Sequence, residues 1–103
     1  MLPLISNHRT EIAELCRRFR VRRLEVFGSA ERETDFDPAR SDVDFLVEFV
    51  PDVTPPTLDT YFTLRESLSA AVGLPVDLVM AGSIRNPYLR AEIERSKETV
   101  YAA

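Results

Sequence analysis

The sequence lacks the features that mark secreted and membrane proteins. Its single cysteine, Cys16, excludes an internal disulfide and fits a reducing compartment. No apolar run approaches the roughly 20 residues that a membrane span needs. The N-terminus also lacks the basic segment and apolar core of a signal peptide. We therefore expect a cytoplasmic protein that does not associate with a membrane.

Positive charge is scarce as well. The 13 basic residues are outnumbered by 17 acidic ones, which gives a net charge of −4. A general nucleic-acid binder usually carries a basic excess, so we do not expect direct binding of nucleic acid. The 103 residues contain no repeat, low-complexity segment or break in composition, and we expect one domain over residues 1–103.

The stretch from Asp42 to Phe49 alternates between two kinds of position. One set is apolar, Val43, Phe45, Val47 and Phe49, and the other is Asp42, Asp44, Leu46 and Glu48. Period-two alternation predicts a strand whose apolar face packs on helices. The opposite face carries two carboxylates, Asp42 and Asp44, which point the same way. Because like charges held this close repel each other, they favour a shared cation, and oxygen ligands of this kind suit Mg²⁺.

A second feature precedes this strand. Leu24, Val26 and Phe27 form a short apolar run that ends at Gly28 and Ser29. A strand that runs into Gly-Ser and a polar turn can hold phosphate, because glycine lets backbone N–H groups approach closely and a following helix start favours anions. Alone, Gly-Ser is also an ordinary turn. Followed by Asp-x-Asp at the next strand, it is a more specific sign.

Together these residues resemble the nucleotidyltransferases of the polymerase-beta superfamily, and most of all the minimal, single-domain MNT type. The motif of that family is Gly-Ser, a spacer and Asp-x-Asp, and here Gly28-Ser29 is followed by twelve residues and then by Asp42-Val43-Asp44. Arg32 lies where the family often has an arginine, whereas Glu33 replaces a common glycine. The spacer is slightly longer than in many members, which implies a small insertion near residues 35–38.

The resemblance covers nearly the whole chain, since VDLVM and the ending NPYLRAEIERSKETVYAA are also similar to the family. Asp77 lies in the first of these segments, within a strand that we predict over residues 75–80. A lone carboxylate among apolar residues is costly unless it is paired or metal-bound, although on an edge strand it could simply point to water. The family carries its third carboxylate at this place.

The resemblance implies an α/β nucleotidyltransferase fold with a small mixed sheet flanked by helices. Asp42 and Asp44 would hold two Mg²⁺ ions, and Asp77 would hold the one that activates the acceptor hydroxyl. Gly28 and Ser29 would hold the triphosphate of ATP, and Arg32 would neutralise charge there. Larger relatives add a domain that positions the acceptor, and only about 25 residues follow Asp77 here, so the acceptor is expected to be a separate molecule.

The usual partner in the MNT family is a HEPN protein, an RNA-cleaving toxin. The resemblance therefore implies an antitoxin that transfers AMP from ATP to a tyrosine hydroxyl of this toxin and forms a hetero-oligomer with it. Two alternatives stay open: a non-catalytic antitoxin that acts by binding alone, and nucleotidyl transfer to a small molecule such as an antibiotic. The intact motif residues count against the first alternative, and the lack of an acceptor-binding half counts against the second.

The other elements follow from apolar spacing. It predicts helices over residues 4–20, 58–72 and 87–96, strands over 23–28, 42–50 and 75–80, and either a short strand or a packed tail at 99–101. We expect a short helix or turn at 29–33 and a loop at 34–41, in which Asp35 and Asp37 are turn formers rather than metal ligands.

A basic cluster lies between the first helix and the first strand, and consists of Arg17, Arg18, Arg20, Arg22 and Arg23. Such a cluster is either a solvated helix end or a contact for an acidic partner or for nucleotide phosphates. With Tyr88 and Tyr101 of the C-terminal helix and tail, it is a candidate surface for the partner protein.

Overall fold

The computed structural model describes residues 2–28, 42–51 and 56–103. Its elements are α1 (Pro3–Ser6), α2 (Arg9–Arg18), β1 (Val21–Phe27), β2 (Val43–Phe49), α3 (Leu58–Val72), β3 (Val76–Met80), α4 (Pro87–Ser96) and β4 (Glu98–Ala102). Ser29 and Arg32, the turn expected at 29–33, and the loop at 34–41 with Asp35 and Asp37 lie outside the described residues.

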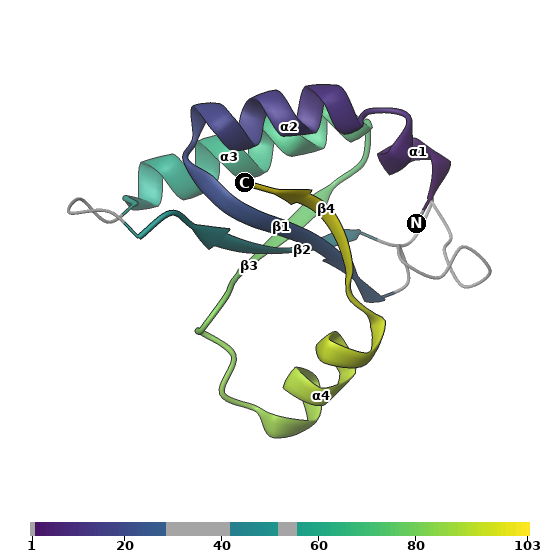
Figure 1. The fold of residues 1–103 in the computed structure, drawn as a ribbon, viewed down its shortest axis with the longest axis vertical. Coiled ribbons are helices and arrows are strands. Elements are labelled where there is room, and N and C mark those ends of the chain that lie inside the picture. The colour runs from purple at the N-terminus through teal and green to yellow at the C-terminus, as the bar shows by residue number, and fades with distance from the viewer. Residues whose placement is uncertain (1, 29–41, 52–55) are drawn as a thin grey trace.

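The four strands form one mixed sheet in the order β3-β2-β1-β4. β1 pairs antiparallel with β2 and with β4, whereas β2 and β3 are parallel. Helices α2 and α3 cover one face of the sheet and α4 lies against the other (Figure 1). The predicted fold class, α/β with a small mixed sheet flanked by helices, is confirmed.

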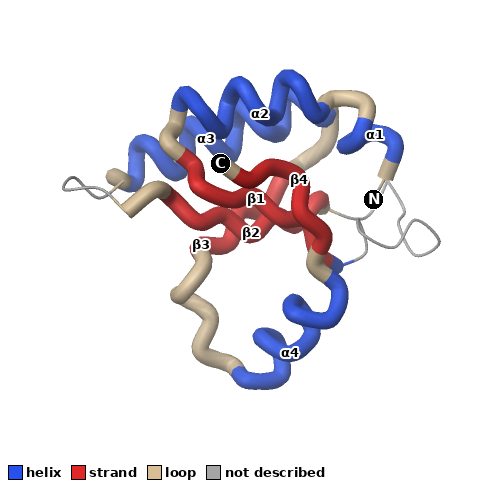
Figure 2. Tube along the Cα trace, in the orientation of Figure 1, coloured by secondary structure: helices blue, strands red, loops and turns tan. Residues whose placement is uncertain are grey.

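The alternation of β2 separates two cores of unequal size. Val43, Phe45 and Val47 are fully buried on the face that α2 and α3 cover. On the opposite face Leu46 joins Phe27 and Ile93 in a smaller core beneath α4. Figure 2 shows the same arrangement, with α2 and α3 on one side of the strands and α4 on the other. The polar set of β2 therefore lies on the side of α4.

The prediction of one continuous helix over residues 4–20 was wrong, because the chain is interrupted at Asn7 and His8. The imidazole of His8 donates from Nδ1 to the carbonyl oxygen of Leu4 at 2.7 Å, and α2 begins at the next residue. The change of direction brings the short α1 into the main core, which buries its Ile5 completely.

Helix α2 ends where β1 must begin. Arg20 has a φ of 60°, which is a left-handed conformation that reverses the chain after the last turn of the helix. Cys16 is fully buried near this end, as predicted for a core residue. Burial raises the pKa of its thiol to about 12, so the side chain stays neutral and behaves as a small apolar group.

Helix α3 has the ends and the stripe that the sequence predicts. The Thr57 hydroxyl accepts a hydrogen bond from the Thr60 amide at 3.1 Å and caps the start. Gly73 closes the helix in a left-handed conformation with a φ of 76°. Leu64 and Leu68, one turn apart, bury the inner face against the sheet.

Residues 98–102 form the strand β4, which settles the alternative left open for residues 99–101. It lies at the edge of the sheet beside β1, and the Arg9 guanidinium donates to its Thr99 carbonyl at 3.0 Å. Within the described ranges, no helix is both long and apolar enough to cross a membrane.

Candidate active site

Asp44 and Asp77 come together on the sheet face that α4 shares, and Asp42 lies close enough to repel Asp44. Asp44 of β2 and Asp77 of β3 are direct neighbours in the parallel ladder. Residues paired in this way send their side chains to the same face of a sheet. Asp42 lies just before β2, two positions from Asp44, and is exposed. The spacing in the sequence thus predicted Asp42 beside Asp44, and the strand pairing adds Asp77.

The negative charge of this cluster acts on Asp44. Its pKa is raised from 3.8 to about 6, first by burial of its carboxyl, then by repulsion from Asp77 and from Asp42. Asp44 is half-buried, whereas the other two are exposed. A bound cation would offset the repulsion and favour the ionised form of Asp44.

The donor set fits Mg²⁺ that is shared with a phosphorylated substrate. No three His, Cys, Asp or Glu side chains of the described residues converge as a metal cage built from protein alone would require. Mg²⁺ does not need such a cage, since it keeps several waters and takes one or two carboxylates together with substrate phosphates. The oxygens of Asp44 with Asp42 or Asp77 supply such a partial shell.

Gly28 follows β1 and lies directly against this cluster. Its φ of 72° is left-handed, and a Cβ added to it would come 3.1 Å from Oδ2 of Asp44. Phe27 is paired with Asp44 in the β1–β2 ladder, so the end of β1 and the start of β2 meet at the carboxylates. Only glycine combines this backbone conformation with room for the carboxyl group.

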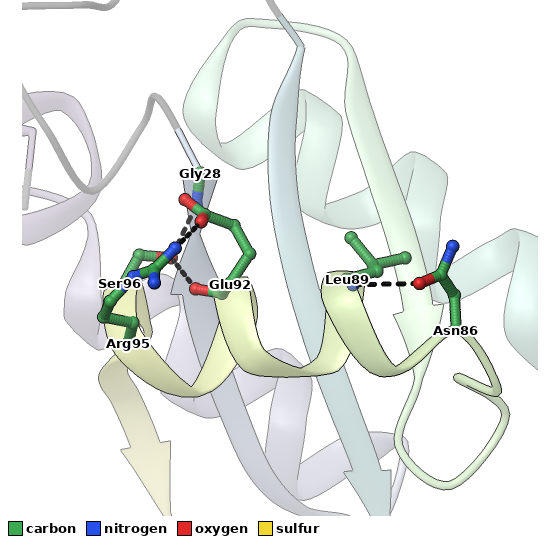
Figure 3. A network of polar contacts seen from close by, with 6 residues as sticks. All are labelled: Gly28, Asn86, Leu89, Glu92, Arg95 and Ser96. Atoms are coloured by element: carbon green, nitrogen blue, oxygen red, sulfur yellow. Dashed lines mark hydrogen bonds and ion pairs between the residues drawn. The ribbon is translucent and has the colours of Figure 1, made fainter.

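One contact of this site could not be seen in the sequence. The Gly28 amide donates to Oγ of Ser96 at 3.4 Å, and Ser96 donates in turn to the carbonyl oxygen of Glu92 at 2.9 Å. Figure 3 shows the last turn of α4 lying beside Gly28, with an ion pair between Arg95 and Glu92 next to it. The two partners are 68 residues apart, and no local pattern links them.

The basic cluster lies far from the carboxylates. Arg22 and Arg23 belong to the first residues of β1, whereas Gly28 follows the last one. Five residues of an extended strand span about 17 Å, so even Arg23, the nearest of these cations along the chain, lies well along β1 from Gly28. Arg22 instead forms an ion pair with Glu48 at 3.5 Å. The position of the cluster favours a solvated helix end or a contact for an acidic partner over the phosphate contact.

The sequence left open whether Asp77 points to water from an edge strand or is paired with another group, and the structure shows features of both. Strand β3 is an edge of the sheet, and the carboxyl group of Asp77 is exposed to solvent. At the same time it adjoins Asp44 in the ladder. Asp77 is therefore both solvent-exposed on an edge strand and next to the half-buried carboxyl group of Asp44.

The model of one protein family, described as "Nucleotidyltransferase domain", matches residues 9–100. The chain belongs to this nucleotidyltransferase domain family. It is 38% identical over 99 residues to the protein adenylyltransferase MntA of Thermococcus cleftensis, a match that covers 95% of this chain and 88% of that protein.

Solved structures agree with this assignment to the nucleotidyltransferase family. A structure assigned as a minimal nucleotidyltransferase is 30% identical, with a TM-score of 0.71, and the match covers 90% of this chain and 89% of that one. A complex of a tri-AMPylated Shewanella oneidensis HEPN toxin with an MNT antitoxin shares the fold at 18% identity and a TM-score of 0.65, covering 96% of this chain and 73% of that one. The fold is therefore the minimal nucleotidyltransferase fold that the sequence predicted.

Proposed function

We propose that this protein transfers AMP from ATP to a tyrosine hydroxyl of a HEPN-type RNA-cleaving toxin and thereby acts as its antitoxin. The observation that carries the proposal is the pairing of Asp44 with Asp77 on an open edge of the sheet, with Asp42 and Gly28 beside them. The relatedness to a protein adenylyltransferase and the fold shared with a toxin–antitoxin complex support the choice of AMP and of the acceptor.

Each residue has a distinct part in this reaction. Asp42 and Asp44 would hold two Mg²⁺ ions, and Asp77 would hold one of them on the acceptor side. When bound, the ions neutralise phosphate charge and polarise the reacting oxygens. The Gly28 amide, with Ser29 and Arg32, would hold the triphosphate. Because the Gly28 amide already donates to Ser96, a phosphate oxygen would share or replace this hydrogen bond.

The transfer is a single displacement at the α-phosphorus of ATP. The acceptor oxygen forms a bond to this phosphorus, the bond from phosphorus to the bridging oxygen breaks, and pyrophosphate leaves. Asp77 would take the proton of the hydroxyl, because it is exposed and adjoins Asp44, which would hold the nucleotide through Mg²⁺. Positioning and charge stabilisation supply most of the acceleration in phosphoryl chemistry.

AMP on the toxin would neutralise it through charge and bulk. Each added group carries a negative phosphate, which repels the phosphates of RNA at the toxin's surface. The antitoxin itself has a net charge of −4, so we propose that it contacts the toxin and ATP but not RNA.

One experiment distinguishes the proposed function from neutralisation by binding alone and from transfer to a small molecule. The purified protein, or its Asp44→Asn variant, is incubated with ATP, Mg²⁺ and the protein encoded next to it, which we propose to be the HEPN-type toxin, and the toxin is then separated and assayed for RNA cleavage. We expect toxin recovered from the wild-type reaction to be inactive and toxin recovered from the variant reaction to be active.

If both recovered toxins cleave RNA equally and carry no added mass, neutralisation is by binding alone and the enzymatic proposal is wrong. If the toxin is unmodified while ATP is consumed in the presence of a small hydroxylated compound, the acceptor is a small molecule.

A further inference from the structure

Helix α3 presents large apolar side chains to solvent. Leu58 is 75% exposed and Phe62, one turn later, is 44% exposed. The guanidinium of Arg65 lies 5.0 Å from the ring centroid of Phe62, and the ring of Tyr61 meets that of Phe62 edge-on. Leu58 and Phe62 thus lie on the outer side of α3, and Tyr61 lies between them and β3, where its hydroxyl forms a hydrogen bond. Exposed apolar side chains count as a contact site only where they continue into a larger apolar surface.

Leu58 and Tyr61 border an open groove between the first turns of α3 and the edge strand β3. The groove has a volume of about 460 Å³ and is lined mainly by apolar residues: Pro56, Leu58, Tyr61, Leu78, Val79 and Met80. Val79 lies two residues beyond Asp77 on the same strand face, which is about 7 Å along the strand. The groove thus continues the surface on which the proposed acceptor carboxylate lies.

Two backbone carbonyl groups of β3 that border the groove already accept hydrogen bonds. The Tyr61 hydroxyl donates to the carbonyl oxygen of Leu78, and the Ser83 hydroxyl donates to that of Met80 at 2.7 Å. Alternate residues of a strand point their carbonyls outward, so these are the acceptors that an added strand would need. A partner therefore does not extend the sheet here, and must bind through its side chains.

We propose that the acceptor protein docks on this apolar surface, formed by Leu58, Tyr61 and Phe62 of α3 and Val79 and Met80 of β3. The inference rests on the proposed function. An acceptor hydroxyl that reaches Asp77 belongs to a body that covers the neighbouring edge of β3, because Asp77 lies on that edge strand. This edge offers apolar side chains and no free central carbonyls, so it fits the apolar face of a helix.

Leu58→Glu tests the surface without disturbing the fold. The side chain is 75% exposed, and it is the first residue of α3, where a negative charge is favourable. Tyr88→Glu is the matched control and also tests the rival surface that the sequence suggested, since Tyr88 is 86% exposed and lies in the first turn of α4 on the other face of the sheet. Each variant is measured for ATP affinity, for affinity to the neighbouring HEPN-type protein, and for KM and kcat of transfer to it.

We expect Leu58→Glu to weaken binding of the HEPN-type protein and to raise its KM at least about tenfold, with kcat and ATP affinity unchanged. Tyr88→Glu should change none of these values. An effect of Tyr88→Glu alone would place the partner on α4 and overturn the inference. Equal effects of both variants would also overturn it, because the contact would then not be specific to α3. A change in the protein's own oligomeric state with Leu58→Glu would assign the surface to a second copy of this chain.

The result is distinguishable from a failure of the proposed function. Suppose that the wild-type protein binds the HEPN-type protein but transfers no AMP, and that Leu58→Glu weakens this binding. The docking surface is then supported and the enzymatic proposal is wrong. If transfer occurs and Leu58→Glu alters neither binding nor KM, the docking surface is wrong and the enzyme stands.

Discussion

Replacing Asp44 with asparagine is expected to stabilise the metal-free protein at neutral pH, although it removes a residue of the candidate site. The folded protein raises the pKa of Asp44 from 3.8 to about 6 through burial and through repulsion from Asp77 and Asp42. Ionised Asp44 therefore disfavours the folded state. Asparagine is similar in shape and carries no charge, so it removes this penalty.

The size of the effect follows from the shift. Two pKa units correspond to about 3 kcal/mol, at 1.36 kcal/mol for each unit. Since Asp44 is only half-buried, solvent screens part of this, and we expect a gain of about 1–2 kcal/mol in the free energy of unfolding. For a domain of this size that is a rise in Tm of roughly 4–10 °C.

The pH dependence has a definite sign. The pKa of Asp44 is higher in the folded than in the unfolded chain, so the folded state binds the proton more tightly between about pH 4 and pH 6. The wild-type protein loses stability as the pH rises through this window, and the variant does not. The advantage of asparagine is therefore complete near pH 7 and nearly gone at pH 4.

The assay is urea unfolding in EDTA at pH 7.5 and pH 4.0. Glu66→Gln, which removes an exposed carboxylate from α3, serves as the control and should change stability by less than about 0.5 kcal/mol. Equal stability of the wild-type protein and Asp44→Asn at pH 7.5 would refute the reasoning. So would a gain that is as large at pH 4.0 as at pH 7.5.

Three further predictions concern other residues. Asp77→Asn should lower the transfer rate about 100-fold or more while ATP binding persists, because Asp42 and Asp44 remain. Loss of ATP binding in a titration would contradict the assignment of Asp77 to the acceptor. Gly28→Ala should destabilise the fold by about 2 kcal/mol in urea unfolding, because it combines a left-handed φ with a contact on Asp44, and a neutral effect would refute that contact. Asn86→Ala should cost about 1 kcal/mol in thermal unfolding, because the Asn86 side chain caps α4, whereas Asn86→Asp should restore the stability.

The residues that the sequence located correctly are those governed by local periodicity. Alternation along β2 placed Val43 and Phe45 in the main core and Asp44 on the other face, and burial follows that division. The caps of α3 could also be predicted, because Thr57 and Gly73 act on residues that are close to them in the chain. These features depend on backbone geometry that a few adjacent residues determine.

The features that the sequence did not predict depend on residues far apart. Glu25 is only 6% exposed, although it is charged, because it faces the space beneath α4, where Lys97 approaches it to 3.7 Å. The contact of Ser96 with Gly28 is of the same kind. The break at His8 was missed for a different reason, since apolar spacing continues across it while the chain direction changes.

The distribution of the described contacts also explains why α4 could not be placed in advance. Its sequence predicts a helix but shows no wide apolar stripe, and only Ile93 is buried. The helix is positioned by this residue and by the polar contacts at its last turn. Its place beside the carboxylates is therefore a property of the tertiary structure.

The central claim is that the carboxylates of this site catalyse transfer of AMP to a partner protein. Its most direct test is the intact mass of the neighbouring HEPN-type protein after incubation with ATP, Mg²⁺ and either the wild-type protein or Asp44→Asn. The account predicts that the wild-type protein adds one or more AMP groups, located on tyrosine by peptide mapping, and that Asp44→Asn adds none. An unmodified partner in both reactions, or equal modification by both proteins, would contradict it.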